Sequence, residues 1–258
     1  MIYKNIHFVF DKTTKSKSCK NFFIQKYKNT SIKKAEIIVV VGGDGFMLNT
    51  IKKFENLKKP FFGINKGSYG FLMNKFSKKD IFLRLNKTKK IIISPLKANL
   101  ITKNNKNKSS IAINEVSLFR QTRQTASLEI KLNKKTIIKK LVSDGVLVST
   151  PAGSTAYNFS VHGPILSLDS KNIAVTPISP FRPRKWKGLI VSAKNVIKIK
   201  NLDIKKRPIS AVADNNEFRN IKEVMIKIDK KRKFTLLYDK NNSLFRKNKF
   251  EQNLNKKP

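Results

Sequence analysis

A continuous run of β-branched residues near residue 40 constrains the fold of this chain more than any other feature. Residues 37–41 read Ile-Ile-Val-Val-Val, and the run stops at the glycine turn of residues 42–45. A strand without polar alternation is buried on both faces, as in a parallel sheet that helices cover on both sides. The first part of the chain is therefore predicted to be an α/β domain.

Further elements of this domain follow from the apolar pattern. Residues 6–10 and 61–64 are predicted strands, and residues 21–27 a predicted helix. A second helix is expected after the glycine turn and is expected to end at Pro60. A third is expected after Ser77, which begins a capping-box-like sequence. The domain is predicted to span residues 1–94.

The pattern changes near Ser94-Pro95, where short alternating segments separated by polar turns begin. Such regular short strands predict an all-β domain over residues 95–240. The last residues, 241–258, form a basic tail that is either frayed or packed back on the first domain. The predicted strands contain Leu96, Ala98 and Leu100; Ile111 and Ile113; Leu128, Ile130 and Leu132; Ile137 and Ile138; Val146 and Val148; Val196, Ile197 and Ile199; Val224, Ile226 and Ile228; Phe234 and Leu236.

The charge of the chain allows two explanations. In 258 residues, 56 Lys and Arg face 16 Asp and Glu, a formal net charge of +40. Binding of nucleic acid or an anionic membrane is one explanation. Codon-driven composition is the other and is favoured, because the cations are nearly all Lys and are spread along the chain.

Two further features bear on the class of protein. Cys19 is the single cysteine, which excludes a disulfide framework. No export signal is recognised in the first ten residues, and no run of 18 apolar residues occurs, so a cytoplasmic protein without membrane contact is expected.

The first motif that can carry chemistry is the turn Gly42-Gly43-Asp44-Gly45 between the buried strand and a helix. Open α/β sheets bind ligands at the carboxyl ends of strands, and the helix N-terminus attracts phosphate. Glycine permits positive φ and a close approach of backbone amides to a ligand. A plain turn with an Asx bond is the alternative, but it does not need three glycines. The spacing matches neither a Walker A loop nor the dinucleotide-binding fingerprint.

Two weaker motifs follow along the chain. The glycine-rich segment from Gly63 to Leu72 follows the next strand and lies beside the first turn if the two strands are neighbours. A flexible connection explains this segment equally well. Asn114 and Glu115 follow the strand that ends at Ile113, and an amide with a carboxylate can bind a base edge and ribose hydroxyls.

The densest motif is the block of small and hydroxyl residues from Ser143 to Ile165. Small side chains let a flat ligand approach the backbone. Asp144 can accept a hydrogen bond from a ribose hydroxyl or an amide, and Tyr157 can stack on a base. A capped turn alone hardly needs so many small polar residues, so the block favours a binding function.

Together these four motifs resemble the NAD kinase family. The resemblance covers about residues 35–165 in the family's order, and the block from Asp144 to Pro164 is its most specific part. It implies an N-terminal Rossmann-like α/β domain and a C-terminal β-sandwich-like domain. It also implies transfer of the γ-phosphoryl group of ATP, or of polyphosphate, to the 2′-hydroxyl of the adenosine ribose of NAD, which gives NADP.

The resemblance also implies partners and a cofactor. NAD and ATP are the expected substrates, and a divalent cation such as Mg²⁺ is expected to arrive with ATP, with no metal site made by the protein alone. A homo-oligomer, a dimer or a tetramer, is implied as well. The basic aromatic segment from Arg182 to Trp186 adds a hint of a subunit contact.

Site residues are carried over one by one. Asp44 is similar to the general base that faces the 2′-hydroxyl, Asn114 and Glu115 look like contacts to the adenosine and a ribose, and Asp144 resembles the residue at the nicotinamide end. The family's usual Asp-Gly reads Asp214-Asn215 here, which is a departure. The other implied contacts to nucleotide are Gly42, Gly43, Gly45, Phe46, Phe71, Ala152, Thr155, Ala156, Tyr157, Asn158, Phe159, Ser160 and Asn216.

Two rival functions remain open at this stage. A lipid kinase also uses Gly-Gly-Asp-Gly, but it leaves the block after Ser143 unexplained. A basic nucleic-acid-binding protein explains the charge but none of the glycine motifs, and we find no RNP-type or helix-turn-helix element. No specific binding of nucleic acid is expected.

Overall fold

The structure is a computed structural model that describes residues 3–67 and 70–240. Its contacts divide the chain into two compact units. The first takes the chain up to Ile93 and again from Lys233, and the second is Ser94–Arg232. The basic tail predicted over residues 241–258 lies outside the described residues.

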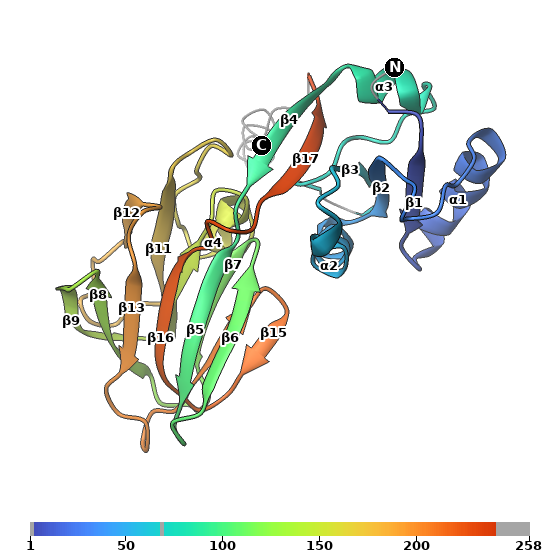
Figure 1. The fold of residues 1–258 in the computed structure, drawn as a ribbon. Helices are drawn as coiled ribbons and strands as arrows, with labels where there is room; N and C mark the ends of the chain where they lie inside the picture. Colours follow the sequence, from blue (N-terminus) through green and yellow to red (C-terminus); the bar gives the residue numbers. More distant parts are fainter. Residues whose placement is uncertain (1–2, 68–69, 241–258) are drawn as a thin grey trace, which may run out of the picture. The chain divides into compact units, whose positions relative to one another are not determined.

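The first unit contains a five-stranded sheet in the order β1-β2-β3-β17-β4 (Figure 1). Strands β1, β2 and β3 run parallel, as the buried run predicts. Strand β17 also runs parallel to β3, and β4 at the edge is antiparallel to β17. The elements are β1 (Ile6–Phe10), α1 (Thr14–Lys26), β2 (Ile37–Gly42), α2 (Asp44–Lys53), the 3-10 turn η1 (Glu55–Leu57), β3 (Phe61–Asn65), α3 (Ile81–Asn86), β4 (Thr88–Ile93) and β17 (Phe234–Asp239).

Strand β2 lies in the middle of the first unit's core. Every residue from Ile37 to Gly42 is buried. Val39 and Val41 pack in one cluster with Phe23 of α1, while the intervening Val40 points to the other face of the sheet. Helix α2 packs against β2 and β3. The parallel sheet thus brings the ends of β2 and β3 to one edge.

Three helix boundaries differ from the predictions. Helix α1 begins at Thr14 and not near residue 21, because the small residues Ser16 and Cys19 are buried among lysines that mask the pattern. Helix α2 ends at Lys53, well before Pro60. The cap of α3 is Asp80, whose carboxylate accepts the Leu83 amide at 3.1 Å, and not Ser77.

The second unit is a sandwich of two six-stranded antiparallel sheets, which confirms the predicted β domain. The sheets have the orders β12-β11-β10-β7-β14-β15 and β6-β5-β16-β13-β8-β9. One cluster of buried side chains joins them, with Leu118 and Val148 from the first sheet and Leu128 and Val224 from the second. The elements are β5 (Leu96–Thr102), β6 (Asn107–Ala112), β7 (Glu115–Arg120), β8 (Ala126–Leu132), β9 (Lys135–Ser143), β10 (Gly145–Ser149), η2 (Gly153–Thr155), α4 (Tyr157–Ser160), β11 (Asn172–Ile178), β12 (Leu189–Ser192), β13 (Ile197–Asn201), β14 (Ile209–Ala213), β15 (Asn216–Phe218) and β16 (Ile221–Ile228).

One strand is assigned to the wrong domain by the sequence pattern. The segment from Phe234 to Asp239 was predicted inside the β domain, but it is β17 of the first sheet. Alternation reports that a segment is a strand and does not report its pairing partner. Strands β4, β7, β11, β12, β14 and β15 have no predicted counterpart.

Among the described residues, no helix combines the length and the apolar character needed to cross a lipid bilayer.

Candidate functional site

The two glycine motifs of the first unit meet at the carboxyl ends of β2 and β3. The Lys66 amide donates to the Gly42 carbonyl at 2.8 Å, and the Cα atom of Gly67 lies 3.9 Å from the position that a Cβ on Gly43 would take. The prediction that the second loop lies beside the first turn is confirmed, because β2 and β3 are neighbouring strands.

Asp44 joins these two motifs through its carboxylate. It is the first residue of α2, and its Oδ2 accepts the Phe71 amide at 2.7 Å while Oδ1 accepts the Leu72 amide at 3.0 Å. The side chain is half-buried. Asp44 therefore shapes the second loop in addition to any role toward a ligand, a contact that the sequence does not reveal.

Different physical reasons explain the presence of glycine at different positions of the first turn. None of Gly42, Gly43 and Gly45 has the positive φ that glycine permits, so left-handed backbone does not explain them. A Cβ on Gly42 would lie 2.8 Å from Phe46 Cδ1, so a side chain at this position would force Phe46 to move. A Cβ on Gly45 would meet no atom within 4 Å. The open space at Gly45 is available to a ligand.

The N-terminus of α2 adds donors at the same place. Gly43 is its N-cap and has no side chain to accept the first amides of the helix. Such amides and the helix dipole attract anions, and phosphate is the common case. Phe46 is half-buried on the first turn of this helix, and Phe71 is half-buried beside Asp44 in the second loop.

A second group of predicted residues gathers in the β-sandwich, around the turn that links β6 to β7. Thr150, which follows β10, donates its amide to the Asn114 carbonyl at 2.9 Å and its hydroxyl to the Ile113 carbonyl at 2.7 Å. Thr150 Oγ1 in turn accepts the Gly153 amide at 3.1 Å. Gly153 packs so closely that a Cβ would fall 2.2 Å from the Asn114 carbonyl oxygen. Thr150 thus fixes the Asn114–Glu115 turn to the middle of the small-residue block, although the sequence did not single it out.

Three polar atoms of these two segments are shielded from solvent and have no hydrogen-bond partner among the described residues. They are Asn114 Oδ1, Glu115 Oε2 and Thr155 Oγ1. Burial, followed by the nearby charge of Asp214, raises the pKa of Glu115 to about 8. The Glu115 carboxyl is therefore mostly protonated at neutral pH and can donate a hydrogen bond.

The aromatic and acidic residues of the block lie around this turn. The Tyr157 ring packs against Phe119 with its centroid 5.7 Å away, and its pKa is raised by burial and by the charges of Asp144 and Glu115. Asp144 Oδ1 pairs with Arg120 Nε at 2.5 Å. The sequence analysis does not identify Arg120, because nothing marks it among the 56 cations.

The side chain of Asn158, which was predicted to belong to the wall of the nucleotide site, makes hydrogen bonds within its own loop. This side chain is fully buried, donates to the Ser154 and Pro164 carbonyls at 3.2 and 2.8 Å, and accepts the Thr176 hydroxyl at 2.7 Å. The amide group is thus used to fold the loop. The remaining predicted residues of the block are Ala152, which is buried, Ala156 and Phe159, which are half-buried, and Ser160, which is exposed.

Asp214 and Asn216 lie at the turn between β14 and β15. The Asp214 carboxylate accepts backbone amides of the Ile113–Glu115 segment, with Oδ2 taking Ile113 at 2.8 Å and Oδ1 taking Asn114 at 2.9 Å. Asn216 is exposed and donates from Nδ2 to Ser110 Oγ at 3.4 Å. The sequence analysis predicts Asp214 as a residue of this site, and the structure shows its carboxylate bonded to backbone amides.

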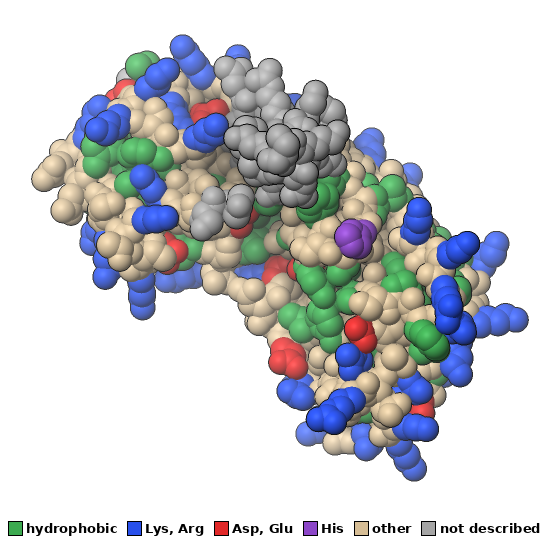
Figure 2. All heavy atoms as spheres, turned by 180° about the vertical axis from the view of Figure 1, so that it is seen from behind, with side chains coloured by type: hydrophobic (Ala, Val, Ile, Leu, Met, Phe, Trp, Pro, Cys, Tyr) green, Lys and Arg blue, Asp and Glu red, His purple; other side chains and the backbone are tan. Residues whose placement is uncertain are grey.

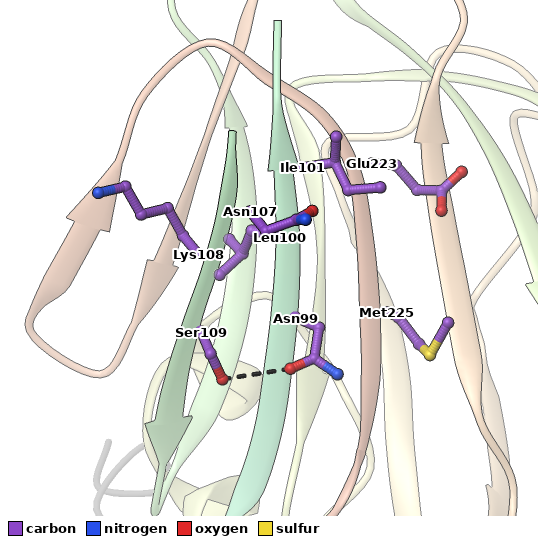
Figure 3. A pocket seen from close by; sticks show the side chains of 8 residues that line it. All are labelled: Asn99, Leu100, Ile101, Asn107, Lys108, Ser109, Glu223 and Met225. Atoms are coloured by element: carbon purple, nitrogen blue, oxygen red, sulfur yellow. Dashed lines mark hydrogen bonds between the residues drawn. The ribbon is translucent and has the colours of Figure 1, made fainter. Parts of the chain in front are cut away.

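A separate pocket of about 360 Å³ opens on the sheet that holds β5, β6 and β16 (Figure 3). In its lining, Ser109 Oγ donates to Asn99 Oδ1 at 3.2 Å between the paired strands β5 and β6. None of the predicted site residues lines this pocket. Its lining residues are Asn99, Leu100, Ile101, Asn107, Lys108, Ser109, Glu223 and Met225.

The fold and these sites are those of a nucleotide-handling enzyme. The sequence matches the ATP-NAD kinase N-terminal domain over residues 4–90 and the ATP-NAD kinase C-terminal domain over residues 113–237. The chain belongs to the NAD kinase family and is a phosphotransferase.

Relatives in several bacteria support this assignment. An NAD kinase of Xanthomonas campestris pv. campestris is 45% identical over 223 residues, which is 86% of this chain and 86% of the relative. An NAD kinase of Zymomonas mobilis subsp. mobilis is 43% identical over 246 residues and 95% of both chains.

Solved structures share the fold at lower identity. Yeast NADH kinase in complex with NADH gives a TM-score of 0.79 at 20% identity, over 96% of this chain and 86% of the yeast chain. An NAD kinase from Archaeoglobus fulgidus in complex with ATP gives 0.71 at 22% identity, over 95% and 96%. The predicted two-part fold is thereby confirmed.

Proposed function

We propose that this protein transfers the γ-phosphoryl group of ATP to the 2′-hydroxyl of the adenosine ribose of NAD, which gives NADP and ADP. Membership of the NAD kinase family supports the reaction class. The lipid-kinase and nucleic-acid alternatives gain no support, because neither explains the match of both halves of the chain.

The observation that carries the proposal is the group of shielded, unpartnered atoms Asn114 Oδ1, Glu115 Oε2 and Thr155 Oγ1. A buried polar atom without a partner costs about 1–3 kcal/mol. A ligand rich in hydroxyl and amide groups recovers that cost when it binds. The riboses, the adenine and the carboxamide of NAD offer such groups, which supports NAD as the ligand of this turn.

The phosphates of ATP are assigned to the glycine turn of the first unit. The uncapped amides at the start of α2 suit an anion, and the open space at Gly45 leaves room for it. Phosphoryl transfer needs positioning and charge neutralisation more than covalent chemistry. We assign the divalent cation to the MgATP substrate.

Asp44 is proposed as the general base. The proton of the 2′-hydroxyl passes to its carboxylate while the ribose oxygen forms a bond to the γ-phosphorus and the bond to the ADP oxygen breaks. The amides of Phe71 and Leu72 hold this carboxylate at the start of α2, beside the turn to which the ATP phosphates are assigned.

Incubation of the purified protein with NAD, ATP and Mg²⁺ tests the reaction. NADP is expected, scored with a dehydrogenase that accepts only NADP, and 2′-deoxy-NAD in place of NAD is expected to give no phosphorylated product. Folded protein that phosphorylates NAD with neither ATP nor polyphosphate would contradict the proposal.

A homo-oligomer remains part of the proposal. Phe181 is 54% exposed and lies near two guanidinium groups, with the guanidinium carbons of Arg182 and Arg184 4.5 and 5.6 Å from its ring centroid. Aromatic and arginine side chains are enriched at interfaces, which supports a subunit contact here. Light scattering is expected to give a multiple of 29.6 kDa, and a monomer would remove this part. A cytoplasmic location also remains a prediction, which fractionation of cells tests.

A further inference from the structure

Asp214 makes an unusual set of hydrogen bonds for a residue of a two-residue turn. Its carboxylate accepts the amides of three consecutive residues: Ile113 at 2.8 Å, Asn114 at 2.9 Å and Glu115 at 3.4 Å. Its own amide donates to the Glu115 carbonyl at 3.1 Å. Four hydrogen bonds therefore join this turn to a segment about 100 residues earlier in the chain.

The backbone conformation at Asp214 indicates that this position holds an aspartate because of its side chain. Asp214 has φ +50°, in the left-handed region that glycine adopts without steric cost. The other turns with positive φ in the sandwich include Asn105 and Asn220, at φ 57° and 55°. An aspartate where glycine is easiest is consistent with a need for the carboxylate itself.

Building on the proposed function, we propose that Asp214 is a positioning residue. Its carboxylate holds the Ile113–Glu115 segment in the shape that presents Asn114 Oδ1 and Glu115 Oε2 to NAD, and its charge lies near the Glu115 carboxyl. Asp214 itself does not contact the nucleotide, because both of its oxygens are turned to backbone amides.

The charges around Glu115 support the second half of this proposal. The Asp214 carboxylate faces it from the β14–β15 turn, and Tyr157 faces it from α4. Asp144 lies near Tyr157 and is paired with Arg120, which offsets its charge. Burial is the larger cause of the raised Glu115 pKa, and Asp214 is the second.

The sign of the pH effect follows. Below about pH 8 the Glu115 carboxyl is protonated and donates a hydrogen bond to the ligand. Above that pH it becomes an anion and loses this donor, so NAD affinity falls as the pH rises. Without the charge of Asp214 the midpoint moves to lower pH, while burial still holds it above the ordinary value of 4.5.

Two variants and a control test the proposal without any ligand. D214G relieves the backbone and removes the acceptor oxygens, whereas D214N removes the charge and keeps one oxygen. N105G is the matched control, since it makes the same backbone change at φ 57° in another turn. Hydrogen exchange of the Asn114 and Glu115 amides is expected to quicken about tenfold or more in D214G and to stay unchanged in N105G.

The carboxyl carbon of Glu115, followed by NMR against pH, reports the charge effect. A midpoint near 8 is expected in the wild-type protein, and a lower midpoint in D214N. A merely structural role of Asp214 would leave this midpoint in place. An unmoved midpoint in D214N with intact folding would overturn the electrostatic part of the proposal.

NAD binding and turnover complete the test. The KM for NAD is expected to rise about 10- to 100-fold in D214G, with kcat at saturating NAD little changed, as for lost binding geometry. Weakened NAD binding with wild-type exchange at Asn114 and Glu115 would instead make Asp214 a direct contact and overturn the proposal. Wild-type protein that binds no NAD would refute the proposed function. Hydrogen exchange and the carboxyl titration would still test whether Asp214 positions the Ile113–Glu115 segment, because neither measurement needs a ligand.

Discussion

Asp44 makes two backbone hydrogen bonds that an asparagine in its place does not reproduce. Asn keeps one acceptor oxygen and turns an NH₂ group toward the other of the Phe71 and Leu72 amides. Asp44→Asn is therefore expected to lower the melting temperature, by a loss on the order of 1–3 kcal/mol for the unsatisfied amide.

The same variant tests the catalytic role of Asp44. A general base contributes about 10²–10⁴ in rate, so kcat is expected to fall by that factor. NAD affinity is expected to change by less than about tenfold. Asp11→Asn is the matched control. It removes the same carboxylate charge close to Gly42, and among the described residues the Asp11 carboxylate accepts the amide of the neighbouring Lys12. A kcat near wild type in folded Asp44→Asn would exclude the base role.

Gly42 and Gly45 are expected to respond to alanine in opposite ways. Gly45→Ala adds a methyl group that meets no atom within 4 Å, and alanine favours a helix by about 0.8–1.0 kcal/mol over glycine. Its stability is expected to hold or rise while kcat/KM for ATP falls. Gly42→Ala brings the new carbon to 2.8 Å from Phe46 and 3.0 Å from Asp11, so its stability is expected to fall.

Melting curves and ATP kinetics on both glycine variants check this pair. If Gly45→Ala keeps wild-type kinetics for ATP, the open space at Gly45 does not serve the phosphates. If Gly42→Ala melts at the wild-type temperature, the packing argument for Gly42 is wrong.

At the scale of elements, strand β17 depends on one buried side chain. Asn74 Nδ2 donates to the Gly63 carbonyl at 3.1 Å and to the Leu237 carbonyl at 3.0 Å, and its Oδ1 accepts the Asp239 amide at 2.9 Å. Asn74 is 0% exposed. It therefore joins the end of the chain's last described strand to the segment that follows β3.

Asn74→Ala is expected to destabilise the first unit. It leaves three backbone groups in the interior without this partner, and one such group costs about 1–3 kcal/mol. Urea unfolding monitored by circular dichroism is expected to show a lower midpoint than wild type. Asn99→Ala is the control, because the Asn99 side chain bonds Ser109 Oγ among the described residues and does so at an exposed position. Equal midpoints for the two variants would refute the role of Asn74.

The elements that sequence predicted well are those whose burial shows in their own residues. The run at residues 37–41 gave a buried parallel strand, and alternation gave most strands of the sandwich. Strand β17 was misplaced because its pairing with β3 and β4 is a long-range contact. The positioning by Asp214 and Thr150 was missed for the same reason, since a side chain that accepts or donates to distant backbone leaves no local pattern.

At the scale of the whole molecule, the candidate site does not explain the large positive net charge. The formal net charge is +40, and Figure 2 shows Lys and Arg side chains scattered over the visible surface of the described residues. A specific nucleic-acid site gathers its cations on one face or along one element. The scatter over this face therefore favours composition over a dedicated binding surface.

A protein with this charge is nevertheless expected to bind DNA without regard to sequence at low salt. Each phosphate that a lysine neutralises releases counterions, so affinity falls steeply as salt rises. For 6–10 such contacts the loss is about 10³–10⁵ between about 50 and about 200 mM salt. Fluorescence anisotropy with two short duplexes of unrelated sequence is expected to give equal affinities and the same steep dependence of affinity on salt, with heparin competing against both.

NADP formation at about 200 mM salt is expected to be unaffected by added DNA, because the proposed NAD and ATP contacts lie in defined turns and not on the scattered lysines. A complex that prefers one duplex and survives at that salt concentration would show that the cations form a true nucleic-acid site, and the charge would then need a function of its own.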